Sequence, residues 1–363
     1  MIYEKRLLIL YFPCVEIDLN KIKHNTQQLV NLCSNNGIEV MAVTKGVCGL
    51  ADVAKIFIKG GAQKLGDSRI RNIVSLKQSG IDLPVYLIRI PMVSEVTDVV
   101  KWADGSLNSE IQVIEALSEA AQSLGKSHRV ILMVDVGDLR EGILPEHVIE
   151  TVDEIIELPG IEFEGIGTNL GCYGGIMASY ENMKVLVDLA KDIEKKYSFK
   201  VKTLSGGNSS TLLLLKSGGL APGINQFRLG EGILLGNDPG TSRPLPGTYQ
   251  DSIILKTEVI EIKTKPSYPI GEIGRDAFGN IPIFKDKGLM RRAIVALGKQ
   301  DCRIEGLTPL DRSIQILGAS SDHLLLDVTK SNNIEVGSII EFNLSYGALL
   351  SLMTSKYVNK CTI

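Results

Sequence analysis

Short apolar runs alternate with longer amphipathic runs between Ile38 and Gly236. In the longer runs apolar residues recur every three or four positions, as in helices that bury one face, whereas the short runs are almost continuously apolar, as in parallel strands buried on both faces. Eight such units in roughly 200 residues favour a (β/α)8 barrel over an open Rossmann sheet. The eight expected strands cover residues 38–43, 62–66, 84–89, 105–108, 129–136, 163–169, 201–206 and 225–230.

The pattern changes after Gly236. Residues 237–250 are rich in proline and glycine and predict a linker, and the β-rich runs that follow contain no long helix before the last fifteen residues. We therefore expect an α/β protein with a (β/α)8 TIM-type barrel over residues 13–236 and a C-terminal β-barrel domain over residues 237–363. A strand from residues 1–17 would complete that second domain.

Composition excludes several functions. The formal net charge is −3 and no basic cluster is present, so neither nucleic acid nor a membrane surface is an expected partner. The six cysteines form no CxxC pair and the four histidines form no HExxH motif, so we expect no metal site and no disulfide framework. The short apolar run 7–13 predicts neither a signal peptide nor a membrane span, and the expected location is the cytoplasm.

Candidate chemistry follows the strands, because the reactive residues of such barrels stand where the strands end. Lys45 comes directly after the first strand, residues 206–210 form a Gly-Gly-Asn-Ser-Ser turn at the end of the seventh, and Arg228 lies on the eighth. Taken singly, a lysine at the rim of a barrel is more often a solvated side chain than a reactive one. A turn of this kind, taken singly, more often caps a helix than binds an anion. Together, an anion-binding turn, a lysine and arginines suit pyridoxal 5′-phosphate better than a sugar phosphate.

Several motifs carry a resemblance to a known family. Lys45, the run Asp135-x-Gly137-x-x-Arg140-x-Gly142, Asn208-Ser209 and Arg228-x-Gly230 fall in the order and spacing of the alanine racemase-like enzymes of fold type III, which use pyridoxal 5′-phosphate. The runs VTKGVCG, LGDSRIRNI, GTNLGCYGG, ALGKQDC and GASSDHLLLD look most like the ornithine racemase branch. The resemblance spans about residues 13–357 and implies a two-base racemase of ornithine or a similar basic amino acid.

The resemblance also implies roles for individual residues. Lys45 would bind the cofactor covalently and act as a base on one face of the substrate. Arg140 would contact the phenolic oxygen of the cofactor, Arg228 would face its pyridine nitrogen, and Asn169 stands where alanine racemases have a histidine against the ring. The phosphate would be held by Asn208 and Ser209, by N–H groups around Gly230 and Glu231, and by Tyr357 as a further donor.

The second base cannot be transferred in this way, because Lys299 stands where the family has its catalytic tyrosine. His323 titrates near working pH and lies in a matched motif, so we predict it as the second base, with Lys299 as the runner-up and Cys302 as a further candidate. Asp301, Ser321 and Asp322 are expected to contact the substrate, with Asp322 or Asp301 as the partner of its distal ammonium. Alternatively, residues 320–323 form only a turn.

The family resemblance also implies a homodimer in which each partner completes the other's site. Alternatives remain open: a racemase of alanine or lysine, a decarboxylase of the same fold, or a non-catalytic carrier of the cofactor. The decarboxylases place an acidic residue where this chain has Arg228, and the carriers end after the barrel. The products formed from L-ornithine would distinguish these alternatives. The cysteines 14, 33 and 361 are expected to be small structural side chains.

Overall fold

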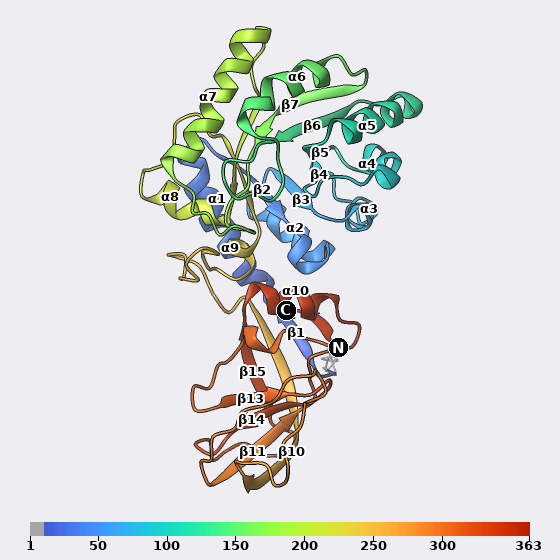
Figure 1. Ribbon diagram of the computed structural model, residues 1–363. Helices are drawn as coiled ribbons and strands as arrows, with labels where there is room; N and C mark the ends of the chain where they lie inside the picture. Colours follow the sequence, from blue (N-terminus) through green and yellow to red (C-terminus); the bar gives the residue numbers. More distant parts are fainter. Residues whose placement is uncertain (1–10) are drawn as a thin grey trace, which may run out of the picture. The chain divides into compact units, whose positions relative to one another are not determined.

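A computed structural model of the protein describes residues 11–363 (Figure 1). Residues 1–10 of the N-terminal strand predicted over 1–17 lie outside the described residues. The described residues form two compact units, one of residues 19–250 and one of residues 11–18 together with 251–363. The first unit contains the predicted closed barrel of eight parallel strands, in which β9 pairs with β2 through Gln226 and Glu39. The barrel strands are β2 (Glu39–Val43), β3 (Lys64–Asp67), β4 (Val85–Leu87), β5 (Gly105–Asn108), β6 (His128–Met133), β7 (Ile161–Gly167), β8 (Thr203–Asn208) and β9 (Gln226–Leu229).

Helices surround this barrel and bury their apolar faces against it (Figure 1). The packing follows from the three- and four-residue spacing; in α5, for example, Val113, Ile114 and Leu117 are buried. Apolar side chains also fill the interior of the barrel, around Met41 and Ile131. The helices of this unit are α1 (Leu19–Ser34), α2 (Ala51–Lys59), α3 (Ile70–Gln78), α4 (Val96–Trp102), α5 (Ile111–Leu124), α6 (Val148–Ile156), α7 (Tyr180–Tyr197), α8 (Leu212–Lys216) and α9 (Glu231–Leu234).

The segment 237–250 packs with the barrel unit. The buried side chain of Asn25 in α1 donates to the carbonyls of Ile233 and Tyr249, at 3.0 and 2.8 Å, and accepts from the N–H of Tyr249 at 2.7 Å. These bonds hold α9, which precedes the segment, and Tyr249 near the end of the segment against α1. The compact units consequently divide between residues 250 and 251, after the proline- and glycine-rich segment.

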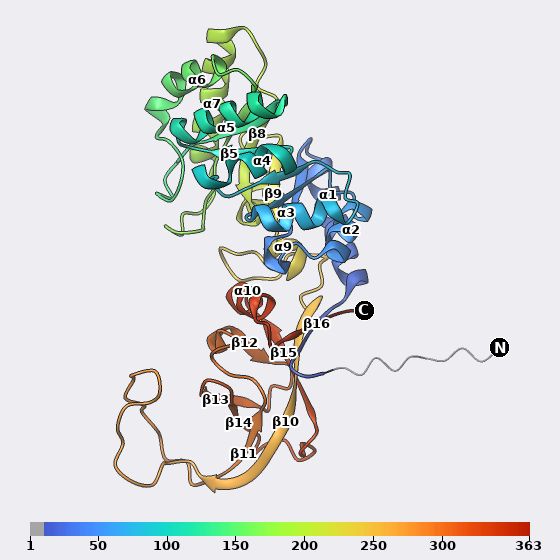
Figure 2. The ribbon, with the colours of Figure 1, turned by 90° about the vertical axis from the view of Figure 1, so that its right-hand side faces the viewer.

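The second unit is built on one long strand, β10 (Ile253–Pro266), which Figure 2 shows bending along the unit. Its first half pairs with β15 (Ile339–Leu344) and its second half with β11 (Leu289–Val295). Two strands from opposite ends of the chain add to it, because β1 (Cys14–Ile17) pairs with β10 and with β16 (Asn359–Thr362). The unit also contains β12 (Leu307–Pro309), β13 (Gln315–Ala319), β14 (Leu324–Asp327) and α10 (Tyr346–Thr354).

The sheet of this second unit is open, whereas the sequence predicted a small barrel. Its strand path is β12-β15-β10-β11-β14-β13, and the two end strands do not pair with each other in the described chain. Alternating apolar runs determine which faces of the strands are buried, but they do not specify whether a sheet closes, so the sequence pattern could not decide this point. In residues 11–363 no helix is long and apolar enough to cross a membrane.

Candidate active site

Lys45 lies at the carboxyl end of the barrel, where β2 has ended and a short 3-10 turn, η1 (Lys45–Val47), begins. Burial lowers the pKa of its amine below the usual value; the Cys172 sulfur and Asp67 act against this shift, and the cations of Arg140 and Arg228 act with it. The amine therefore loses its proton more readily than an exposed lysine would. A neutral amine is the form that can attack a carbonyl carbon.

Arg140 is carried by a tightly folded loop after β6. The carboxylate of Asp135 accepts hydrogen bonds from the N–H groups of Gly137 at 2.8 Å and Leu139 at 3.2 Å. Gly142 returns the loop with φ +127°, and a Cβ there would lie 2.6 Å from the backbone nitrogen of Asp135, so no other residue fits without strain. This loop sets the position of Arg140 at the same end of the barrel as Lys45.

Two amide side chains connect Arg140 to the turn after β8. The Asn169 amide lies 3.2 Å from Nη1 of Arg140 and 2.9 Å from the amide nitrogen of Asn208. Asn208 also donates to the carbonyl of Leu170 at 2.8 Å and accepts from the N–H of Ser210 at 2.8 Å, which caps the 3-10 turn η4 (Ser209–Thr211). The predicted residues Asn169, Asn208 and Arg140 are therefore neighbours.

Asp138 anchors the glycine-rich loop that follows β7, a role that no motif in the sequence indicated. Four backbone N–H groups lie 3.0–3.3 Å from its carboxylate oxygens. Partial burial acts to raise the pKa of Asp138, but these four donors hold it below the usual value. The carboxylate thus stays ionised and fixes the loop. The donors belong to Gly171, Cys172, Tyr173 and Ile176.

Arg228 is buried on β9 and held by two acceptors. Its Nη1 donates to the hydroxyl of Ser205, and its Nη2 donates to the carbonyl of Thr168 at 2.5 Å. Burial lowers the pKa of Arg228 to about 10, so the guanidinium remains a cation at neutral pH. Ser205 lies within β8 and Thr168 directly follows β7. Both are in runs that the sequence singled out, but their role depends on the closed barrel that brings three strands together.

Hydroxyl groups and the start of α9 also lie at the carboxyl end of the barrel strands, which we call the mouth of the barrel. Ser209 is buried, and its Oγ accepts from the N–H of Gly232 at 3.1 Å. Burial raises the pKa of Glu231, the first residue of α9, to about 7, and the nearby Asp238 adds to this shift. Buried hydroxyls beside a helix start are suited to an anion. The segment Gly230–Gly232 and Ser209 are brought together as the sequence predicted.

Two predicted motifs meet within the second unit. The N–H of Lys299 donates to the carbonyl of Ser320 at 2.9 Å, and a Cβ on Gly298 would lie 2.0 Å from the carbonyl oxygen of Ser321. His323 places Nδ1 2.8 Å from a carboxylate oxygen of Asp322. The contact engages Nδ1, and both side chains are exposed, at 46% for His323 and 61% for Asp322.

The remaining candidates of this unit have different surroundings. Lys299 lies with Nζ 4.1 Å from the ring centre of Phe278. Asp301 is buried and accepts from the hydroxyl of Ser355 at 2.9 Å, a contact typical of a structural carboxylate. Burial raises the pKa of Cys302 to about 12, which disfavours its thiolate. Tyr357 is 72% exposed, and Ser321 is exposed as well.

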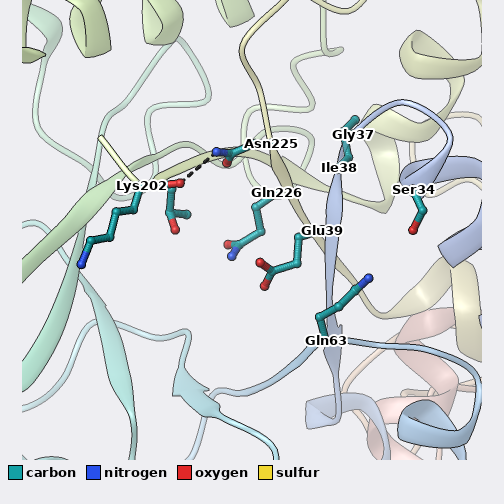
Figure 3. A pocket seen from close by; sticks show the side chains of 9 residues that line it. Ser34, Gly37, Ile38, Glu39, Gln63, Lys202, Asn225 and Gln226 are labelled. Atoms are coloured by element: carbon teal, nitrogen blue, oxygen red, sulfur yellow. Dashed lines mark hydrogen bonds between the residues drawn. The ribbon is translucent and has the colours of Figure 1, made fainter. Parts of the chain in front are cut away.

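Figure 3 shows a cavity of about 390 Å³ at the opposite, amino-terminal end of the barrel strands, where Glu39 and Gln226 point toward each other. Beside it, Lys64 donates to Glu164 at 2.9 Å and Tyr86 donates to Glu164 at 2.6 Å. Polar networks at this end of a barrel serve stability, because catalytic residues collect at the other end. This cavity lies away from Lys45, and we do not assign the chemistry to it.

Comparison with known proteins agrees with this geometry. The chain is 44% identical over 351 residues to an ornithine racemase of Acetoanaerobium sticklandii, covering 96% of this chain and 99% of the relative. It is 41% identical over 349 residues to a lysine racemase of Thermotoga maritima, covering 96% and 98%. The solved structure of an alanine racemase of Clostridium difficile 630 has a TM-score of 0.75 at 22% identity, covering 98% of this chain and 96% of that one, which shows a shared fold.

A family model identifies the barrel unit. It is described as the N-terminal domain of alanine racemase and matches residues 17–238, which include every barrel strand and every site residue found at the barrel mouth. The motifs at Lys45, Arg140 and Arg228 lie in this matched range. With this match and two relatives above 40% identity over nearly their full length, the chain belongs to the alanine racemase family.

Proposed function

We propose that this protein is an amino-acid racemase that depends on pyridoxal 5′-phosphate and interconverts L- and D-ornithine or a similar basic amino acid. The observation that carries the proposal is the half-buried amine of Lys45, whose pKa is lowered at the mouth of the barrel close to Arg140 and Arg228. The names of the two relatives with more than 40% identity support a basic substrate. A lysine racemase is the nearest alternative.

The donors at the mouth fit this cofactor. An amine that is readily deprotonated suits its aldehyde, two arginines suit its ring oxygen and nitrogen, and buried hydroxyls beside the start of α9 suit its phosphate. When bound, pyridoxal phosphate would acidify the α-proton of an attached amino acid. We assign the aldehyde to Lys45, the ring to Arg140, Asn169 and Arg228, and the phosphate to Asn208, Ser209, Gly230, Glu231 and Tyr357.

We propose a separate role for each of the charged residues at the mouth of the barrel. Lys45 would hold and return a proton at Nζ on one face of the substrate, because its lowered pKa lets the amine alternate between its two forms. Arg228 keeps its own protons, since its pKa near 10 leaves it cationic at neutral pH. Arg228 would therefore offer the ring nitrogen of the cofactor a hydrogen-bond donor without giving up a proton to it. Arg140 would orient the ring from the loop fixed by Asp135.

A racemase needs a second proton carrier on the opposite face, and we propose His323. Its Nδ1 is paired with Asp322, so Nε2 would donate and accept the proton. We further propose that His323 acts in a homodimer, from the β unit of the partner subunit, in the cytoplasm. Lys299 remains the runner-up. Of the proposed substrate contacts, Asp301 is buried, whereas Ser321 and Asp322 are exposed and Asp322 already pairs with the imidazole.

Chiral chromatography tests the reaction itself. The purified protein with pyridoxal phosphate is incubated with L-ornithine, L-lysine and L-alanine, and the D-enantiomer is measured. We expect D-ornithine to form fastest, the holoprotein to absorb in the visible, and Lys45→Ala to abolish both. Formation of putrescine and CO₂, or full activity without the cofactor, would refute the proposal.

Deuterium incorporation tests the second base. In D₂O, His323→Asn is expected to stop racemisation while Lys45 still exchanges the α-proton of one enantiomer. Mixing Lys45→Ala with His323→Asn subunits should restore part of the activity if the sites are shared between two chains. If His323→Asn racemises normally, His323 is not the second base and Lys299 becomes the candidate. If the protein is active as a monomer, the sites are not shared between two chains.

A further inference from the structure

Two cysteines from opposite ends of the chain meet in the second unit. Cys14 begins β1 and Cys361 lies in β16, 347 positions later in the sequence. The two strands run parallel, with Cys14 opposite Asn359 and Glu16 opposite Cys361, so the two cysteines are diagonal neighbours across the pair. Their sulfur atoms lie 2.6 Å apart.

The 2.6 Å distance between the two sulfur atoms is closer to the length of a disulfide bond than to the distance between unbonded atoms. Unbonded heavy atoms pack at about 3.5–4.0 Å, whereas a disulfide bond is about 2.05 Å long. Both residues are held by strand pairing, β1 between β10 and β16, so the sulfurs meet because the fold places them together. We propose that Cys14 and Cys361 form a reversible disulfide when the protein meets a small-molecule disulfide such as glutathione disulfide.

The surroundings of the two thiols determine which of them reacts first with the oxidant. Cys14 is buried, whereas Cys361 is partly exposed and therefore meets the oxidant first. Burial, together with the hydrogen bond to Cys361, raises the pKa of Cys14 to about 12, while the cation of Lys256 acts against this rise. Lys256, opposite Cys14 on β10, reduces this rise but does not reverse it, so little Cys14 thiolate forms and we expect the second step to be the slower one.

The exchange balances in two steps. The Cys361 thiolate attacks one sulfur of glutathione disulfide, which forms a mixed disulfide and releases one glutathione thiolate. The Cys14 thiolate then attacks Sγ of Cys361, which forms the protein disulfide and releases the second glutathione. Two protein thiols are oxidised, one glutathione disulfide is reduced to two glutathione molecules, and the two thiol protons pass to them.

The bond would link the first and last strands of the described chain. A link between residues so distant in sequence removes conformations from the unfolded chain, so the oxidised protein should unfold at a higher temperature. The folded state changes little, because the sulfurs already touch. The disulfide would therefore act on stability under oxidising conditions rather than on the residues at the barrel mouth.

Thiol counting and mass spectrometry test this proposal on the full-length protein. After incubation with glutathione disulfide, we expect two of the six thiols to be lost to Ellman's reagent in denaturant. We also expect a non-reduced digest to contain one cross-linked pair of peptides with Cys14 and Cys361, and a higher unfolding midpoint that dithiothreitol reverses. Cys361→Ser should abolish all three effects, and Cys33→Ala, at another buried cysteine, should keep them.

Three results would overturn the proposal. These are retention of all six thiols, a stable glutathione adduct on Cys361 with Cys14 still free, and a cross-link between two chains in place of one within a chain. Because Cys14 is buried, Cys14→Ala alone could lower stability for reasons of packing. The comparison of oxidised with reduced Cys361→Ser, a substitution at the more exposed partner, avoids that ambiguity, since its two forms should then unfold at the same temperature.

Discussion

Replacing Glu231 with glutamine should remove a pH dependence of folding. Burial raises the pKa of this carboxyl from its ordinary value of 4.5 to about 7 in the folded protein, so folding takes up a proton between these two values. The stabilisation is complete below pH 4.5 and is lost as the pH rises to about 7. A shift of this size corresponds to about 3 kcal/mol. Since the side chain retains some exposure, we expect about 2 kcal/mol in practice.

Chemical denaturation at pH 5 and pH 8, without added cofactor, measures this effect. The free energy of unfolding of Glu231→Gln minus that of the native protein should be about 2 kcal/mol larger at pH 8 than at pH 5. Glu162→Gln is the matched control: Lys202 and other nearby cations hold the pKa of Glu162 below its usual value, so its titration lies below this range. An equal difference at both pH values would refute the assignment of a raised pKa to Glu231.

Two further predictions concern residues that support the site. Ser205→Ala removes one of the two acceptors described above for the buried Arg228 guanidinium and should lower the free energy of unfolding by about 2 kcal/mol in urea denaturation. An unchanged value would show that the hydroxyl is not needed. Asp138→Ala releases the loop 171–176, so racemisation should fall by about tenfold or more while the unfolding midpoint changes little. Limited proteolysis should then cut within that loop, and resistance equal to that of the native protein would contradict the anchoring role.

The barrel, and the candidate residues at its mouth, could be predicted from the order of amino acids alone. A strand buried on both faces needs a nearly continuous apolar run, and a helix packed on one face needs apolar residues every three or four positions, so both signals are local. Lys45 and Arg228 could be assigned to the mouth because each follows or ends such a run. The turn containing Asn208 and Ser209 was recognisable for the same reason.

The contacts that support these residues could be identified only from the tertiary structure. Ser205 supports Arg228 because β8 and β9 are neighbours in the closed barrel, and Asp138 fixes a loop that begins more than thirty positions later. The open sheet of the second unit, the burial of Asp301 and the meeting of Cys14 with Cys361 also depend on pairing between distant segments. A local pattern specifies which face of a segment is buried, whereas the partner it meets is set by the free energy of packing the whole chain.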